Sequence, residues 1–186
     1  ADLDRAATGC VAAGYGTTGQ RCTAPRRIVA VRAIAADLTE RLREKTLEVR
    51  VGPGDREDVD VGPMVDEAAL NDVLAAIEQA RSEGAEVLAG GKRAGDGGFF
   101  LEPTLLGGVE RTMTIAREEV FGPVLPVLEV EDFDEALDVA VSTRYGLTSS
   151  IYTRDLNRAI RFVHETDTGL VHVNKPPIGA ESHLPF

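Results

Sequence analysis

The chain has 186 residues, of which 43% are hydrophobic and 5% aromatic, and its formal net charge at pH 7 is −11. An acidic surface without a long Lys/Arg stripe excludes nucleic acid and membranes as expected partners, and with no leader-like apolar run we expect a cytoplasmic protein. Two cysteines and three scattered histidines exclude a disulfide framework and a structural metal site.

The first fifty residues predict a helix, a loop, a strand and a second helix. Asp2 can cap the first helix, and the glycine-rich residues 14–19 end it, so Cys22 follows in a loop. Residues 27–32 (RIVAVR) read as a strand. Residues 33–49 carry apolar positions at roughly helical spacing between charges, which predicts an amphipathic helix.

The middle of the chain predicts a helix followed by a hairpin. Asp66 offers an N-cap to a helix that ends at Gly84, and residues 86–89 form a strand directly after it. The glycine-rich residues 90–98 then predict a turn that joins this strand to residues 99–106 (FFLEPTLL).

The last third of the chain alternates between strand and helix patterns. The predicted elements are residues 124–130, 132–144, 148–153, 155–165 and 169–174. Such alternation predicts a parallel sheet with helical crossovers, and one α/β domain over residues 1–186 accounts for the whole pattern.

Cys22 is the first candidate for chemistry. A loop after a glycine-broken helix can present its sulfur to a cleft. A thiol with an ordinary pKa of about 8.5 needs nearby N–H groups, a cation or a base to act as a nucleophile, and Arg21, Arg26 and Arg27 are candidate cations. Composition and position alone favour the other interpretation, that Cys22 is a small buried hydrophobe.

Two further segments place polar groups beside predicted strands. In REEVFGPVLPV, Glu118 and Glu119 precede Phe121 at a strand entrance, although taken singly two acids are more often a solvated pair. Asn174 follows the strand in TGLVHVNK, where a structural turn role is equally plausible. No G-x-G-x-x-G or P-loop pattern is present to cradle a pyrophosphate.

The segments GQRC, EVFGP and VN…PF, in this order, resemble the aldehyde dehydrogenase superfamily. The resemblance runs nearly end to end, since ADLDRA, EGAEVLAGG, LEPTLL and YGLTSSIYTRDL also match. It implies a three-layer α/β catalytic domain with a mainly parallel sheet covered by helices. It also implies that Cys22 attacks an aldehyde carbonyl, that a thiohemiacetal passes hydride to NAD or NADP, and that water hydrolyses the resulting thioester to a carboxylic acid.

The resemblance also assigns residues around this nucleophile. It implies that Glu119 holds the nicotinamide ribose, that Phe121 packs beside the nicotinamide, and that the Cys22 amide donates to the oxyanion. The residues implied for the substrate side are Arg21, Thr23, Asn174 and Phe186. The run GLVHVNKPPIGAE with the following HLPF is similar to the semialdehyde-oxidising branch, including enzymes acting on 2-oxoglutarate semialdehyde.

Several parts of the family pattern are not in the sequence. They are the E-L-G-G segment with the general base, the upstream Asn of the oxyanion hole, the adenosine-binding motif and the G-G-x-K-x-S-G continuation. We therefore expect a catalytic domain truncated at both ends, without the cofactor-binding domain and the oligomerisation segments of a homodimer or homotetramer, and inactive or nearly so alone. The alternatives are a non-catalytic α/β module that serves a structural or partner-binding role, and an unrelated nucleotide-binding protein in which Cys22 is buried.

Overall fold

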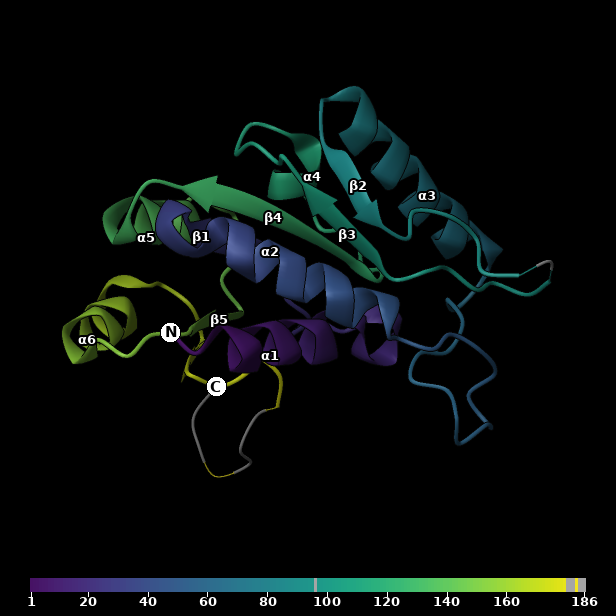
Figure 1. Cartoon of the computed structure of the whole chain (residues 1–186), viewed down its shortest axis with the longest axis horizontal. Coiled ribbons are helices and arrows are strands. Elements are labelled where there is room, and N and C mark those ends of the chain that lie inside the picture. Colours follow the sequence, from purple (N-terminus) through teal and green to yellow (C-terminus); the bar gives the residue numbers. More distant parts are fainter. Residues whose placement is uncertain (96, 180–182, 184–186) are drawn as a thin grey trace.

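The structure is a computed structural model that describes residues 1–95, 97–179 and 183 (Figure 1). Its elements in chain order are α1 (Leu3–Tyr15), the 3₁₀ turn η1 (Gly16–Gly19), β1 (Ile28–Val31), α2 (Arg32–Leu47), α3 (Glu67–Ser82), β2 (Glu86–Ala89), β3 (Thr104–Gly107), α4 (Thr114–Arg117), β4 (Val124–Val130), α5 (Phe133–Val141), β5 (Thr148–Ile151), α6 (Leu156–Glu165) and β6 (Leu170–Val173). Within the described residues, no helix combines the length and the apolar character that crossing a bilayer requires.

The strands form two sheets. The larger has the order β1-β4-β3-β2, in which β1 and β3 run parallel to β4, and β2 pairs antiparallel with β3 as the predicted hairpin requires. The parallel pairing predicted from the alternating elements is confirmed. The alternating pattern did not indicate how many sheets the strands form: β5 and β6 pair with each other, in parallel, as a separate two-stranded sheet.

Side chains of β4 divide the core into two layers. Val124 and Leu128 point to a cluster formed with α3, α4 and α5, whereas Leu125 and Val127 point to a cluster formed with α1 and α2. Successive residues of a strand face opposite sides of the sheet, so a strand buried on both faces reads as a continuous apolar run. The predicted three-layer α/β fold is thus confirmed, with α1 and α2 packed against each other on one face (Figure 1).

Aspartates begin most of the longer helices. The side chains of Asp2, Asp66, Asp132 and Asp155 each accept a hydrogen bond from a backbone N–H in the first turn that follows. These caps satisfy N–H groups that have no partner inside the helix, and they explain why the predicted helix starts hold to within a residue.

Candidate active site

Cys22 lies in a tight turn and is exposed. The Ala24 N–H donates to the Arg21 carbonyl over 3.1 Å, so Cys22 and Thr23 are the two central residues of the turn. Within the part of the chain that the structure describes, the Cys22 amide has no hydrogen-bond acceptor. The interpretation of Cys22 as a buried hydrophobe was therefore wrong, because the residue is exposed.

The other thiol occupies the opposite environment. Cys10 lies on α1 and packs against the core cluster on the α1 and α2 face. Burial raises the pKa of the Cys10 thiol to about 12. Cys10 is half-buried and Cys22 is exposed, so the Cys22 sulfur is the more accessible of the two.

Left-handed backbone turns the chain from α1 towards Cys22. Thr17 and Thr18 have φ of 54° and 58°, which is uncommon for β-branched residues, and Gly19 follows with a φ of 66°. The buried Thr18 hydroxyl donates to the Gly62 and Pro63 carbonyls over 3.2 and 3.3 Å. Those bonds compensate the strained backbone and attach the turn to the loop before α3.

Gly19 joins the loop that carries Cys22 to the EVFGP segment. A Cβ atom built on Gly19 would lie 2.2 Å from the Gly122 carbonyl oxygen, so only glycine permits this approach. Phe121 next to it also has a positive φ, 56°, and its ring is 47% exposed. Two segments separated by about a hundred residues in sequence therefore meet backbone to backbone beside Cys22.

Three of the predicted site residues line one small cavity. Arg21, Glu119 and Phe121 border a space of about 20 Å³ next to the turn that carries Cys22. Thr23 lies half-buried in the same turn but does not line that cavity.

The two remaining predicted residues are not brought to this cavity. Asn174 borders a separate space of about 300 Å³ between α1 and the end of β6. Its side-chain oxygen accepts from the Thr153 N–H and its amide donates to the Thr153 carbonyl, both over 2.9 Å, so Asn174 fixes the chain after β5. Phe186 lies outside the described residues.

Two of the three candidate cations near Cys22, Arg26 and Arg27, are hydrogen-bonded to carbonyl groups of other segments. Arg27 donates to the Ala116 carbonyl over 3.0 Å and to the Val139 carbonyl over 2.5 Å, at the C-terminal ends of α4 and α5. Arg26 donates to the Arg117 carbonyl over 3.1 Å. Neither guanidinium is hydrogen-bonded to Cys22 within the described residues, while Arg21 is exposed and makes no ion pair there.

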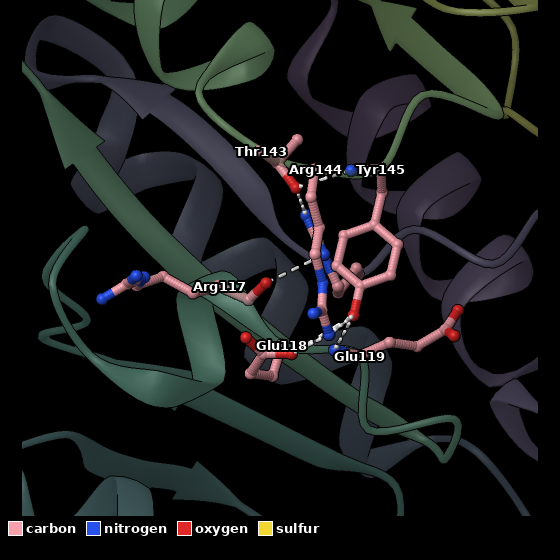
Figure 2. A network of polar contacts seen from close by, with 7 residues as sticks. Arg117, Glu118, Glu119, Thr143, Arg144 and Tyr145 are labelled. Carbon is pink, nitrogen blue, oxygen red and sulfur yellow. Dashed lines mark hydrogen bonds and ion pairs between the residues drawn. The ribbon is translucent and has the colours of Figure 1, made fainter.

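A polar network that the sequence pattern did not suggest surrounds the segment before Phe121 (Figure 2). Tyr145, from the loop between α5 and β5, accepts a hydrogen bond from the Glu119 N–H over 3.3 Å. Arg144 pairs with the Glu118 carboxylate over 2.5 Å. The backbone that carries Glu119 is therefore fixed by side chains from a loop 26 residues further along the chain.

Comparisons with known proteins agree with this architecture. The model of the family described as "Aldehyde dehydrogenase family" matches residues 1–186. The 2,5-dioxopentanoate dehydrogenase of Saccharolobus solfataricus is 41% identical over 186 residues, which are 100% of this chain and 39% of that protein. The alpha-ketoglutarate semialdehyde dehydrogenase of Haloferax volcanii is 45% identical over 177 residues, which are 93% of this chain and 36% of that protein.

A solved structure gives the same result in three dimensions. The betaine aldehyde dehydrogenase of Staphylococcus aureus in complex with NAD+ superposes with a TM-score of 0.96 at 29% identity, covering 100% of this chain and 38% of that one. The chain spans less than two-fifths of the length of each of these proteins. With all 186 residues matched by the family model, the chain belongs to the aldehyde dehydrogenase family.

Proposed function

We propose that this chain supplies the nucleophile in the oxidation of an aldehyde to a carboxylic acid with NAD or NADP, and that Cys22 is that nucleophile. The observation that carries the proposal is the close approach of Gly19 to Gly122. It holds an exposed cysteine turn against the segment of Glu119 and Phe121, the two residues proposed to face the cofactor. Membership of the family and the names of the relatives support the reaction class.

Cys22 has the chemistry that this reaction needs. Its thiolate adds to the aldehyde carbonyl carbon, which becomes tetrahedral, and the former carbonyl oxygen gains the negative charge. The Cys22 N–H, which has no acceptor among the described residues, can donate to that oxygen. Loss of hydride then leaves a thioester on Cys22, and attack by water releases the acid and restores the thiol.

Glu119 and Phe121 fit the nicotinamide end of the cofactor. The Glu119 carboxylate is exposed and makes no side-chain hydrogen bond within the described residues, so it can accept from ribose hydroxyls. The half-exposed Phe121 ring gives the neighbouring apolar surface. When bound, the nicotinamide supplies the hydride acceptor, and the chain's own part is to orient it beside Cys22.

The chain alone is proposed to turn over poorly. The general base is proposed to come from an upstream segment outside residues 1–186, as the family resemblance implies, and a positioned base typically accelerates such a step about 10²–10⁴-fold. The thioester, once formed, should therefore persist.

The relatives also suggest a substrate class. Two of them are named for 2,5-dioxopentanoate and alpha-ketoglutarate semialdehyde. A semialdehyde that carries a carboxylate at its far end is therefore the proposed substrate.

The test uses the full-length product of the encoding gene with 2-oxoglutarate semialdehyde and NAD or NADP. Turnover is measured as the formation of reduced cofactor. A Cys22→Ser variant should lose turnover, whereas Cys10→Ala should keep it because Cys10 lies half-buried on α1 against the core. After incubation of the chain of 186 residues with the aldehyde and the cofactor, the acylated Cys22 peptide should be found by mass spectrometry. Full turnover of the Cys22→Ser variant would overturn the proposal.

A further inference from the structure

Tyr145 lies between two arginine side chains. The Arg26 guanidinium carbon stacks 4.1 Å from the centre of the Tyr145 ring, and that of Arg144 lies 5.1 Å from the same centre. A planar guanidinium over an aromatic face is attracted by the ring's negative face. The ring is thus held by cations from two different segments, one of them only four residues beyond Cys22.

The Tyr145 hydroxyl meets the segment that carries the proposed cofactor residues. It accepts from the Glu119 N–H over 3.3 Å and from the Arg144 guanidinium over 3.1 Å, and it donates to the Glu118 carboxylate over 3.4 Å (Figure 2). Glu118, which the family resemblance leaves without a role, therefore helps to hold the hydroxyl whose other contact is the backbone of Glu119.

Arg26 connects this hydroxyl to the nucleophile loop. Besides the Tyr145 ring, it binds the Arg117 carbonyl over 3.1 Å and the Thr143 hydroxyl over 2.8 Å. Arg26 therefore contacts the chain two residues before Glu119, at Arg117, and two residues before Tyr145, at Thr143. Arg26 lies only four residues after Cys22. A movement of the Glu119 segment relative to Arg26 and Tyr145 therefore changes the distance between Glu119 and the Cys22 turn.

From these contacts we infer that Tyr145 is a positioning residue for the cofactor. It fixes the Glu119 backbone so that the Glu119 carboxylate reaches the nicotinamide ribose while Cys22 faces the reacting carbon. The inference rests on the proposed function, because it needs Glu119 to be a cofactor ligand. Tyr145 itself touches neither cofactor nor substrate in this account and acts only through Glu119.

The matched pair of variants is Tyr145→Phe and Tyr152→Phe. The first removes a hydroxyl with three partners, whereas the second removes a buried hydroxyl that has no partner within the described residues. Tyr145→Phe keeps the ring between the arginines. A hydrogen bond of ordinary net strength corresponds to a change of about 2- to 10-fold, which is the expected size of each effect below.

Two measurements test whether Tyr145 holds the backbone of Glu119. In the chain of 186 residues, the exchange rate of the Glu119 amide proton, read by NMR, should rise about 2- to 10-fold in Tyr145→Phe and stay unchanged in Tyr152→Phe. In the full-length gene product, KM for NAD or NADP should rise by a similar factor. The rate constant kcat and the rate of iodoacetamide labelling of Cys22 should stay within about twofold of the parent.

The outcomes separate this inference from the proposed function. If KM for the cofactor stays unchanged in Tyr145→Phe while Glu119→Gln raises it, Glu119 binds the cofactor but Tyr145 does not position it, and only the inference fails. An equal fall in kcat, Cys22 labelling and thermal stability would also overturn it, because that result describes a general structural role. If Glu119→Gln also leaves KM unchanged, the cofactor role in the proposed function fails with it.

A second variant keeps the test decisive if Tyr145→Phe does not fold. Arg144 is exposed, and Arg144→Gln removes both its bond to the Tyr145 hydroxyl and its pair with Glu118. It should raise KM for the cofactor about twofold, in the same direction as Tyr145→Phe and without a change in Cys22 labelling. An unchanged KM in this variant would refute the inference.

Discussion

Replacing Gly19 with alanine should separate the two halves of the proposed site. The new Cβ atom would lie 2.2 Å from the Gly122 carbonyl oxygen, 2.4 Å from its carbonyl carbon and 2.9 Å from the Pro123 nitrogen. All three are backbone atoms, which cannot rotate away as a flexible side chain would. The substitution therefore forces either the Cys22 turn or the EVFGP segment to move.

The cost can be worked out from two contributions. A non-glycine residue in the left-handed region, where Gly19 has a φ of 66°, costs roughly 1–2 kcal/mol. Forcing a methyl group into a packed contact adds about 1–3 kcal/mol. The expected loss is thus about 2–5 kcal/mol out of a total free energy of unfolding of about 5–15 kcal/mol for a typical domain.

Gly16 gives a matched control three residues away. Its φ is −53°, and a Cβ atom built on it would meet nothing within 4 Å. Gly16→Ala should therefore keep or raise the free energy of unfolding, by about 0.4–1 kcal/mol, because it only restricts the unfolded chain. Urea unfolding monitored by circular dichroism gives both values. The rate of iodoacetamide labelling under native conditions, read by peptide mass spectrometry, reports the accessibility and reactivity of the Cys22 thiol.

The reasoning predicts that Gly19→Ala lowers the urea midpoint and changes the labelling rate of Cys22, and that Gly16→Ala does neither. If the two variants unfold at the same urea concentration, the backbone contact between Gly19 and Gly122 does not stabilise the fold. If Gly19→Ala is destabilised but Cys22 labelling is unchanged, the contact stabilises the fold without setting the position of Cys22.

Two other features give quantitative expectations. Burial raises the pKa of Cys10 from 9.0 to about 12, so the unfolded chain releases this proton at a lower pH than the folded chain. The contribution of the protonated Cys10 thiol to the free energy of unfolding is present below about pH 9 and is lost as the pH rises towards 12. The urea midpoint should therefore fall over this range, and it should fall less steeply in Cys10→Ala. Equal slopes in the two proteins would contradict the burial argument. Asp66→Ala removes the cap that accepts from the Ala69 N–H over 2.8 Å and should cost about 1 kcal/mol by urea unfolding. Asp72→Ala, on the exposed face of the same helix, should change stability by less than about 0.5 kcal/mol, and a similar loss in both variants would argue against a capping role.

Local signals in the sequence predicted most of the elements. Asp66, followed by apolar residues at helical spacing, placed the start of α3, and the glycine-rich residues 90–98 predicted the hairpin of β2 and β3. These features depend on contacts within a few residues, so the sequence contains the information directly. Strand pairing could not be predicted in the same way. The sequence pattern shows that β5 and β6 are strands, but not that they form a sheet separate from β1 to β4.

The site was predictable only where its residues are consecutive. The turn that carries Cys22 follows from its glycines, but the hydrogen-bond partners of Arg26 and Arg27 do not follow from the sequence, where the neighbouring thiol is the nearest polar group of interest. Their side chains instead reach carbonyls 91 and 89 positions away, where they satisfy the open C-terminal ends of short helices. Tyr145 had no signal beyond its place in the YGL run, because its partners come from two distant segments.

Two independent contacts connect the loop that carries Cys22, the proposed nucleophile, to the segment proposed to face the cofactor. One is the glycine-to-glycine approach of Gly19 and Gly122, which sets the separation of the two backbones. The other is the path from Arg26 through the Tyr145 ring and hydroxyl to the Glu119 N–H, which sets the rotation of the segment. Both contacts restrain how the two segments can move relative to each other. For this reason the mutual placement of Cys22 and Glu119 depends on residues within this chain, whatever other segments bind the remainder of the cofactor.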